Sequence, residues 1–247
     1  MNEHTTLKPF FTFYGGKWRA APHYPPPEHK TIIEPFAGSA GYSMRYPDRR
    51  VLLVERDPLI AATWRYLIRV SQSEIRGLPD IQVGQTVDDL NVTPEARLVI
   101  GWWLNGGSAT PKKSPGKWYR SMRQNGGKGW TTGGGQLGWG ACVRERIASQ
   151  LEFIRHWRII EGDYTEAPDW PGTWFIDPPY QVAGKHYRFG PDRIDFETLA
   201  EWCRARDGQI IVCENVGATW LPFRPWRDIK ASERTGTANK SREAIWP

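Results

Sequence analysis

The residues best suited to chemistry lie at 177–180, where Asp177, Pro178, Pro179 and Tyr180 follow the apolar stretch 173–176. Each proline fixes φ and removes a backbone donor, so a strand over 173–176 cannot continue beyond this point. The stiff turn presents a carboxylate, free carbonyls and a ring at the carboxyl end of a strand, where open α/β sheets bind ligands. Such a set suits a planar base with an exocyclic amine, because oxygens accept from NH₂ and a ring stacks on the base. The alternative is an ordinary proline turn with an N-capping acid.

A second candidate site follows residues 31–34, which we expect to form a strand. A turn from Pro35 to Gly41 comes next, and a helix is predicted to start near Tyr42. Strand, glycine turn and helix form a phosphate- or nucleoside-binding corner in Rossmann-like sheets. The spacing is not Gly-x-Gly-x-x-Gly, which argues against a dinucleotide and leaves room for a ligand with an amino-acid tail.

The strand expected at 50–55 ends in Glu55, at about the position of a ribose-binding carboxylate. The alternative is a solvated acid at a strand end. Near the amino terminus, Gly15 and Gly16 let the backbone approach a ligand closely, and Lys17 can reach a carboxylate. The alternative there is a flexible turn with a surface lysine.

Further elements must hold these residues in place. Helices are expected from Pro58 to about Val70, over 93–104, over 143–157 with Ile147, Leu151 and Ile154 on one face, and over 195–206. Strands are expected at 158–164, 209–215, 226–229 and 243–246. Strands that alternate with helices predict an α/β fold with a mainly parallel sheet.

Residues 71–141 form an expected insert whose composition differs from its surroundings. No acidic residue lies between Asn105 and Val143, and the cations are Lys112, Lys113, Lys117, Arg120, Arg123 and Lys128. The interleaved aromatic residues are Trp118, Tyr119, Trp130 and Trp139. Cations among aromatic rings suit phosphate contact and base stacking, so we expect nucleic-acid binding here and at Lys185, Tyr187 and Arg188. The alternative is a solvated flexible loop.

Composition restricts the class of protein. The 247 residues carry a formal charge of +6 and a sequence pI near 9.3, which favours an acidic partner. The three cysteines have no metal-ligand or disulfide spacing, so no metal is expected. No apolar run approaches the length of a membrane span, and no signal-peptide core is seen at the amino terminus. We therefore expect a cytoplasmic protein.

Taken in order, the motifs resemble those of the Dam-type (D12 class) DNA adenine-N6 methyltransferases, and the resemblance covers most of the chain. It implies a Rossmann-like fold with a catalytic domain over 1–70 and 142–247, a target-recognition insert over 71–141, a bacterial or phage origin, and S-adenosylmethionine as cofactor. The cofactor-binding positions that it implies are Tyr14, Gly15, Gly16, Lys17, Glu34, Pro35, Phe36, Ala37, Gly38, Ser39, Gly41, Glu55, Arg56, Asp163, Tyr164 and Asp177. Glu55 stands where Asp is commoner in the family, and the insert is unlike familiar sequence-reading modules.

The resemblance also implies the reaction. The N6 amine of an adenine flipped out of double-stranded DNA would be held by Asp177, Pro178, Pro179 and Tyr180. The glycine-rich insert suggests relaxed sequence specificity. Methylation of RNA adenine or of cytosine N4, and an inactive DNA-binding subunit of the same fold, are the alternatives. A protein-glutamine methyltransferase is disfavoured because the basic aromatic insert would have no role.

Overall fold

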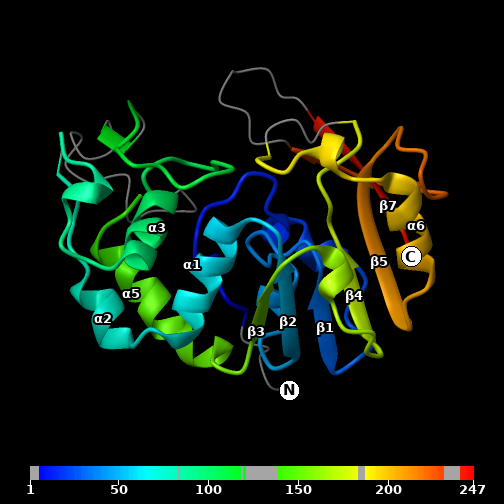
Figure 1. Ribbon diagram of the computed structural model, residues 1–247, viewed down its shortest axis with the longest axis horizontal. Coiled ribbons are helices and arrows are strands. Elements are labelled where there is room, and N and C mark those ends of the chain that lie inside the picture. The colour runs from blue at the N-terminus through cyan, green and yellow to red at the C-terminus, as the bar shows by residue number, and fades with distance from the viewer. Residues whose placement is uncertain (1–5, 83, 118, 121–137, 183–186, 231–239) are drawn as a thin grey trace.

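A computed structural model describes residues 6–82, 84–117, 119–120, 138–182, 187–230 and 240–247. Its centre is a seven-stranded mixed sheet of order β3-β2-β1-β4-β5-β7-β6 (Figure 1). The first five strands are mutually parallel: β1 Thr31–Glu34, β2 Arg50–Glu55, β3 Arg158–Glu161, β4 Gly172–Ile176 and β5 Gly208–Asn215. The last two, β6 Arg224–Lys230 and β7 Lys240–Trp246, pair antiparallel at one edge. The predicted α/β fold with a mainly parallel sheet is confirmed, and it is compatible with a Rossmann-like fold.

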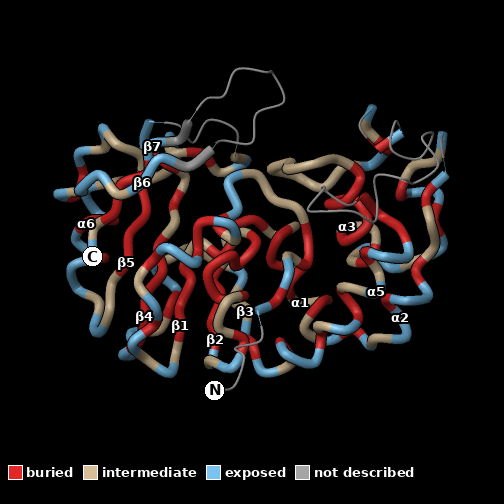
Figure 2. The backbone as a smooth tube through the Cα atoms, turned by 180° about the vertical axis from the view of Figure 1, so that it is seen from behind, coloured by how far each residue is buried: buried red, intermediate tan, exposed pale blue. Residues whose placement is uncertain are grey.

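Both faces of the sheet are buried, so its central strands are almost continuously apolar (Figure 2). On one face Ile32, Leu53 and Phe175 pack in a core with α1 Pro58–Arg69, α3 Pro94–Trp102 and α5 Ala141–Gln150. On the other face Ile33 and Trp174 pack with α6 Phe196–Arg204. Successive residues of each strand thus serve opposite cores, as strand geometry requires.

Helix starts follow their capping residues. The Asp57 side chain accepts from the N–H of Leu59 at the start of α1, and Asp195 does the same for Glu197 at the start of α6. The expected helices at 58–70 and 195–206 are therefore confirmed within a few residues. Among the helices of the described residues, none combines the length and the apolar character needed to cross a bilayer.

Three predicted elements differ from the structure. The helix expected near Tyr42 is only one 3₁₀ turn, Ser43–Arg45, because Pro47 disfavours helical backbone at the preceding Tyr46. The helix expected over 143–157 consists of α5 followed by a 3₁₀ turn, Leu151–Ile154, although its apolar face is buried as predicted. The strand expected over 158–164 stops at Glu161, because Asp163 caps the next 3₁₀ turn.

The described part of the insert packs against the same core as the sheet. Its helices α2 Gln72–Gly77 and α3 contact α5 and α1, respectively. Tyr119 and Trp139 are buried in this core, and the Tyr119 hydroxyl donates to the Trp139 carbonyl at 3.0 Å. The expectation that these two rings belong to a base-stacking surface is wrong, because they have no exposed face on which a base could stack.

Candidate active site

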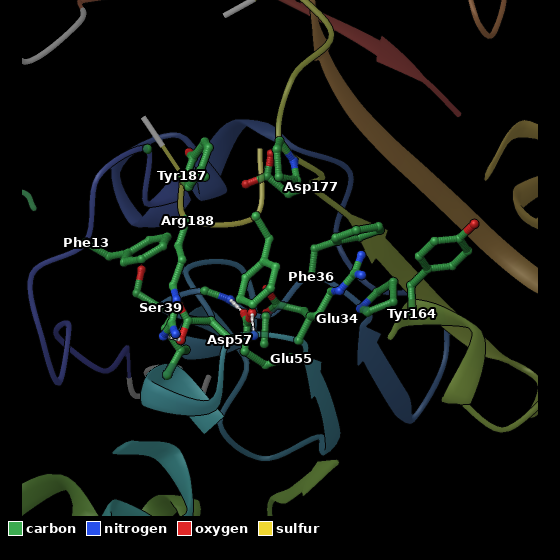
Figure 3. A pocket seen from close by; sticks show the side chains of 18 of the residues that line it. Phe13, Glu34, Phe36, Ser39, Glu55, Asp57, Tyr164, Asp177, Tyr187 and Arg188 are labelled. Carbon is green, nitrogen blue, oxygen red and sulfur yellow. Dashed lines mark hydrogen bonds and ion pairs between the residues drawn. The ribbon is translucent and has the colours of Figure 1, made fainter. Parts of the chain in front are cut away.

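A cavity of about 290 Å³ lies where the strands β1, β2 and β4 end. The sheet order reverses direction between β1 and β4, which is where open α/β sheets bind ligands. Figure 3 shows Asp177 and Tyr187 on one side of the cavity and Glu55 and Asp57 on the other. The lining comes from the amino-terminal glycine turn, the segments after β1, β2, β3 and β4, and the residues before α6. Segments far apart in the sequence therefore share one wall.

Glu55 fixes the glycine turn after β1. Its two carboxylate oxygens accept from the N–H groups of Gly38 at 2.9 Å and Asp57 at 2.8 Å. Gly38 has φ +46°, in the left-handed region that favours glycine, and its carbonyl accepts from the Trp64 indole at 2.8 Å. Burial raises the pKa of Glu55 to about 7, and the two N–H donors limit the rise. Glu55 is thus a bonded, partly buried side chain rather than a solvated acid, and each oxygen keeps a further lone pair.

Glu34, the last residue of β1, is a buried carboxyl group at the floor of the cavity. It is 2 % exposed, and one oxygen accepts from the Ser43 N–H at 2.8 Å. Burial raises the pKa of Glu34 to about 8, although the bond from Ser43 lowers it and the negative charge of Asp177 adds to it. Glu34 is therefore largely protonated at neutral pH.

Asp177 and Lys17 form the charged centre of the site. The Lys17 ammonium lies 2.9 Å from Asp177 Oδ1 and donates to the Gly15 carbonyl at 3.2 Å. Asp177 Oδ1 is buried with the Lys17 ammonium as its charged neighbour, and the Asp177 side chain also interacts with the Tyr180 hydroxyl. Burial raises the pKa of Asp177, and Lys17 offsets part of this rise. Burial lowers the pKa of Lys17, but Asp177 and Glu243 outweigh burial and raise it overall, so the ammonium stays charged.

Tyr180 lies beside this centre and is 9 % exposed. Its hydroxyl donates to Glu243 Oε2 at 2.6 Å, and the Lys17 ammonium lies 4.7 Å from the centre of its ring. Lys17 therefore contacts both groups that the sequence assigns to the target base, the carboxylate and the aromatic ring. Pro179 lines the cavity, whereas Pro178 and Tyr180 are buried and are not among the residues that line it.

An aromatic wall closes one side of the cavity. Phe36 and Tyr164 stack with ring centres 5.3 Å apart, and Trp202 of α6 meets Tyr164 edge-on. Beside them Asp163 pairs with Arg56 at 3.5 Å. This wall combines a flat apolar surface with polar groups, an arrangement that can hold a heterocyclic base.

Tyr187 and Arg188, which the sequence assigns to nucleic-acid binding, line the same cavity. The Tyr187 hydroxyl donates to the Tyr14 carbonyl at 3.4 Å, and its ring meets the Tyr14 ring edge-on. Arg188 pairs with the buried carboxylate of Asp57 at 3.4 Å. Tyr187 therefore covers the amino-terminal glycine turn, whereas Arg188 covers the start of α1.

The cations of the insert differ in their surroundings. Lys113 pairs with Asp88 at 2.8 Å, and the Lys112 ammonium donates to the Thr110 hydroxyl at 3.4 Å. Lys117 and Arg120 are exposed. Trp118, Arg123, Lys128, Trp130 and Lys185 lie outside the described residues.

Most of the expected cofactor-binding residues line one cavity. Those that do so are Gly15, Gly16, Lys17, Glu34, Pro35, Phe36, Ala37, Gly38, Ser39, Gly41, Glu55, Arg56, Asp163, Tyr164 and Asp177, whereas Tyr14 supports the wall from behind. Sequence reasoning missed Phe13, Phe189, Arg193 and Glu243. The position of Phe13 two residues before Gly15 was a usable signal, but no local motif marks Glu243. No group of three or more potential metal ligands occurs among the described residues.

Neither the protein-family models nor the curated proteins that were searched match this chain.

Proposed function

We propose that this chain transfers a methyl group from S-adenosylmethionine to the N6 amine of an adenine flipped out of double-stranded DNA. One observation carries the proposal: the glycine turn after β1 and Asp177 after β4 line the same cavity, although about half of the chain separates them. A cofactor and a target base held in one cavity can meet, which group transfer between them requires.

The groups around the cavity fit the cofactor's chemistry. Lys17 can pair with a carboxylate, Glu34 and Glu55 can accept from ammonium or hydroxyl groups, and Phe36 with Tyr164 offers a flat surface for a purine. The cavity is close to the lower end of the range for small-molecule sites, about 300–1,000 Å³. When bound, S-adenosylmethionine supplies a methyl group on a sulfonium leaving group, so the protein needs no separate activation of the donor.

The turn after β4 is proposed to orient the target amine. Asp177 and the Pro178 carbonyl are proposed to accept hydrogen bonds from the two hydrogens of the target amine and so to orient its lone pair. The same oxygens stabilise positive charge as it develops on the nitrogen. The methylated nitrogen must then lose one proton, which the Asp177 carboxylate can accept. Asp177 suits this role because it lines the cavity beside the Lys17 ammonium, and a carboxylate has about four lone-pair sites with which to accept. The Lys17 side chain must move away from Asp177 and from the Tyr180 ring for the base to enter. Its ammonium already donates one hydrogen bond to the Gly15 carbonyl.

Partner choice rests on charge. Lys117 and Arg120 are exposed on the insert, and the chain carries a net charge of +6. Exposed cations bind phosphates irrespective of sequence. Extruding a base from a duplex costs a few kcal/mol, which contacts of this kind would help to offset.

The test is methyl transfer from labelled S-adenosylmethionine to duplex DNA, followed by identification of the methylated nucleoside. The wild-type protein should produce N6-methyladenine. Asp177→Ala should lower turnover by about 100-fold or more while cofactor binding stays within a few-fold. The matched control is Asp48→Ala, because Asp48 is exposed and lies before β2, at the opposite edge of the sheet.

The nucleoside decides between the alternatives. If N4-methylcytosine or methylated RNA is found, the proposed methyl acceptor is wrong, but transfer of a methyl group from S-adenosylmethionine stands. DNA binding without any transfer would indicate an inactive subunit. Near-native turnover of Asp177→Ala would reject the assigned role of this carboxylate.

A further inference from the structure

The turn that carries Asp177 has few backbone N–H groups with which to form the hydrogen bonds that stabilise an ordinary turn. Pro178 and Pro179 lack N–H groups, and β4 has already ended at Ile176. Neighbouring strands hold it instead. Glu214 of β5 accepts from the Gln181 N–H with both oxygens, at 2.8 and 3.2 Å, and Glu243 of β7 accepts from the Tyr180 hydroxyl at 2.6 Å.

These two carboxyl groups come from opposite faces of the sheet. In the antiparallel register Glu214 lies opposite Ala244, and Asn215 lies opposite Glu243. Because side chains alternate between faces, Glu243 shares a face with Asn215 and not with Glu214. The two acids therefore bond to the turn from opposite faces of the sheet, and both are buried.

Asp177 acts on both acids, since its negative charge contributes to the raised pKa of Glu214, but the closer contact with the proposed chemistry is made by Glu243. Its partner Tyr180 lies under the Lys17 ammonium, which is 2.9 Å from Asp177. Glu243 also attracts Lys17 electrostatically. Glu214 instead bonds to the backbone of Gln181, on the far side of Tyr180.

We infer that Glu243 is a positioning residue for the proposed methyl transfer: through the Tyr180 hydroxyl it fixes the ring and the adjoining Asp177 turn in the geometry that receives the target base. This inference rests on the proposed function. It requires that Glu243 acts through Tyr180, so that loss of Glu243 adds nothing once the Tyr180 hydroxyl, which also bonds to Asp177, has been removed. A misplacement of about 1 Å at a reacting centre can cost about 100-fold in rate, which sets the expected scale.

The test compares Glu243→Ala, Glu243→Gln, Tyr180→Phe and the double variant Tyr180→Phe/Glu243→Ala with an exposed control, Glu201→Ala on α6. We expect Glu243→Ala and Tyr180→Phe each to lower kcat by about 10- to 100-fold, with cofactor affinity within about twofold. The kcat of the double variant should be no lower than that of the less active single variant. Glu243→Gln should recover most of the activity, because an amide oxygen still accepts from the hydroxyl.

A second readout does not depend on activity. Hydrogen exchange of the peptide from Asp177 to Val182 should be faster in Glu243→Ala and Tyr180→Phe than in the wild type and in Glu201→Ala. Losses that multiply in the double variant, or exchange that stays at the wild-type rate, would overturn the inference. If Glu243→Ala does not fold, Tyr180→Phe and Glu243→Gln replace it in the test. A Tyr180→Phe variant with the kcat and the hydrogen-exchange rate of the wild type would overturn the inference. A wild-type protein without methyl transfer would reject the proposed function, and the exchange comparison would still decide whether Glu243 positions the turn.

Discussion

Replacing Glu34 by glutamine should make the protein more stable at alkaline pH. The Glu34 side chain is 2 % exposed, and its pKa is raised by burial from 4.5 to about 8. A carboxyl group whose pKa is raised in the folded state favours folding below its unfolded pKa. That contribution is lost as the pH rises from about 4.5 to about 8. The glutamine side chain resembles the protonated acid and can still accept from the Ser43 N–H, so Glu34→Gln should avoid this loss.

The size of the effect follows from the pKa displacement. At about 1.4 kcal/mol per unit, a rise from 4.5 to about 8 corresponds to an upper bound of about 5 kcal/mol. Water reaching the cavity that Glu34 lines screens part of the penalty, so we expect a gain of about 1–3 kcal/mol at pH 8. Below pH 4.5 the variant and the wild type should be nearly equal in stability.

Urea unfolding at pH 4.5, 6 and 8 measures the difference directly, without ligand. Glu201→Gln, an exposed change on α6, is the matched control and should follow the wild type at every pH. A Glu34→Gln variant whose stability runs parallel to the wild type from pH 4.5 to 8 would refute the reasoning, since it would mean that Glu34 titrates at the same pH in the folded and unfolded protein.

Two further predictions concern the glycine turn and the insert. Gly41→Ala should lower the free energy of unfolding by about 1–3 kcal/mol, because a Cβ there would lie 2.5 Å from the Trp18 backbone nitrogen. Gly77→Ala, in a helix end with open space, should instead raise it by about 0.5–1 kcal/mol, and thermal unfolding distinguishes the two. Replacing Lys117 and Arg120 by glutamine should reduce the slope of log affinity for DNA against log salt by about 2. A slope that stays unchanged would remove these residues from the DNA interface.

Local sequence signals predicted the sheet well because each signal acts over a few residues. Apolar runs bounded by turns marked β1, β2, β4 and β5, and capping residues such as Asp57 marked the helix starts. The helix expected at Tyr42 was wrong because the prediction gave weight to the glycine turn and none to Pro47. Pro47 lies five residues downstream of Tyr42, so the local sequence itself disfavours a longer helix there.

Other features depend on contacts that no local pattern records. Tyr119 and Trp139 stand in a glycine-rich basic stretch, yet both are buried, because the chain folds back onto α5 and α3. In the same way the bond from Tyr180 to Glu243 joins residues 63 positions apart, because the turn after β4 meets β7 only once the sheet forms. Composition indicates which residue types are available, whereas burial is decided by what packs over them.

The charge balance of the cavity favours a cationic ligand. Its lining carries six carboxyl groups against four cations: the acids are Glu34, Glu55, Asp57, Asp163, Asp177 and Asp195, and the cations are Lys17, Arg56, Arg188 and Arg193. Burial raises the pKa of both Glu34 and Asp177. Burial therefore penalises the ionised form of both carboxyl groups. A ligand that brings positive charge into the cavity would lower these pKa values and gain the attraction of the ionised carboxylates. A ligand of equal shape without that charge would gain nothing from them, so under the proposed function we expect tighter binding of S-adenosylmethionine than of its neutral product.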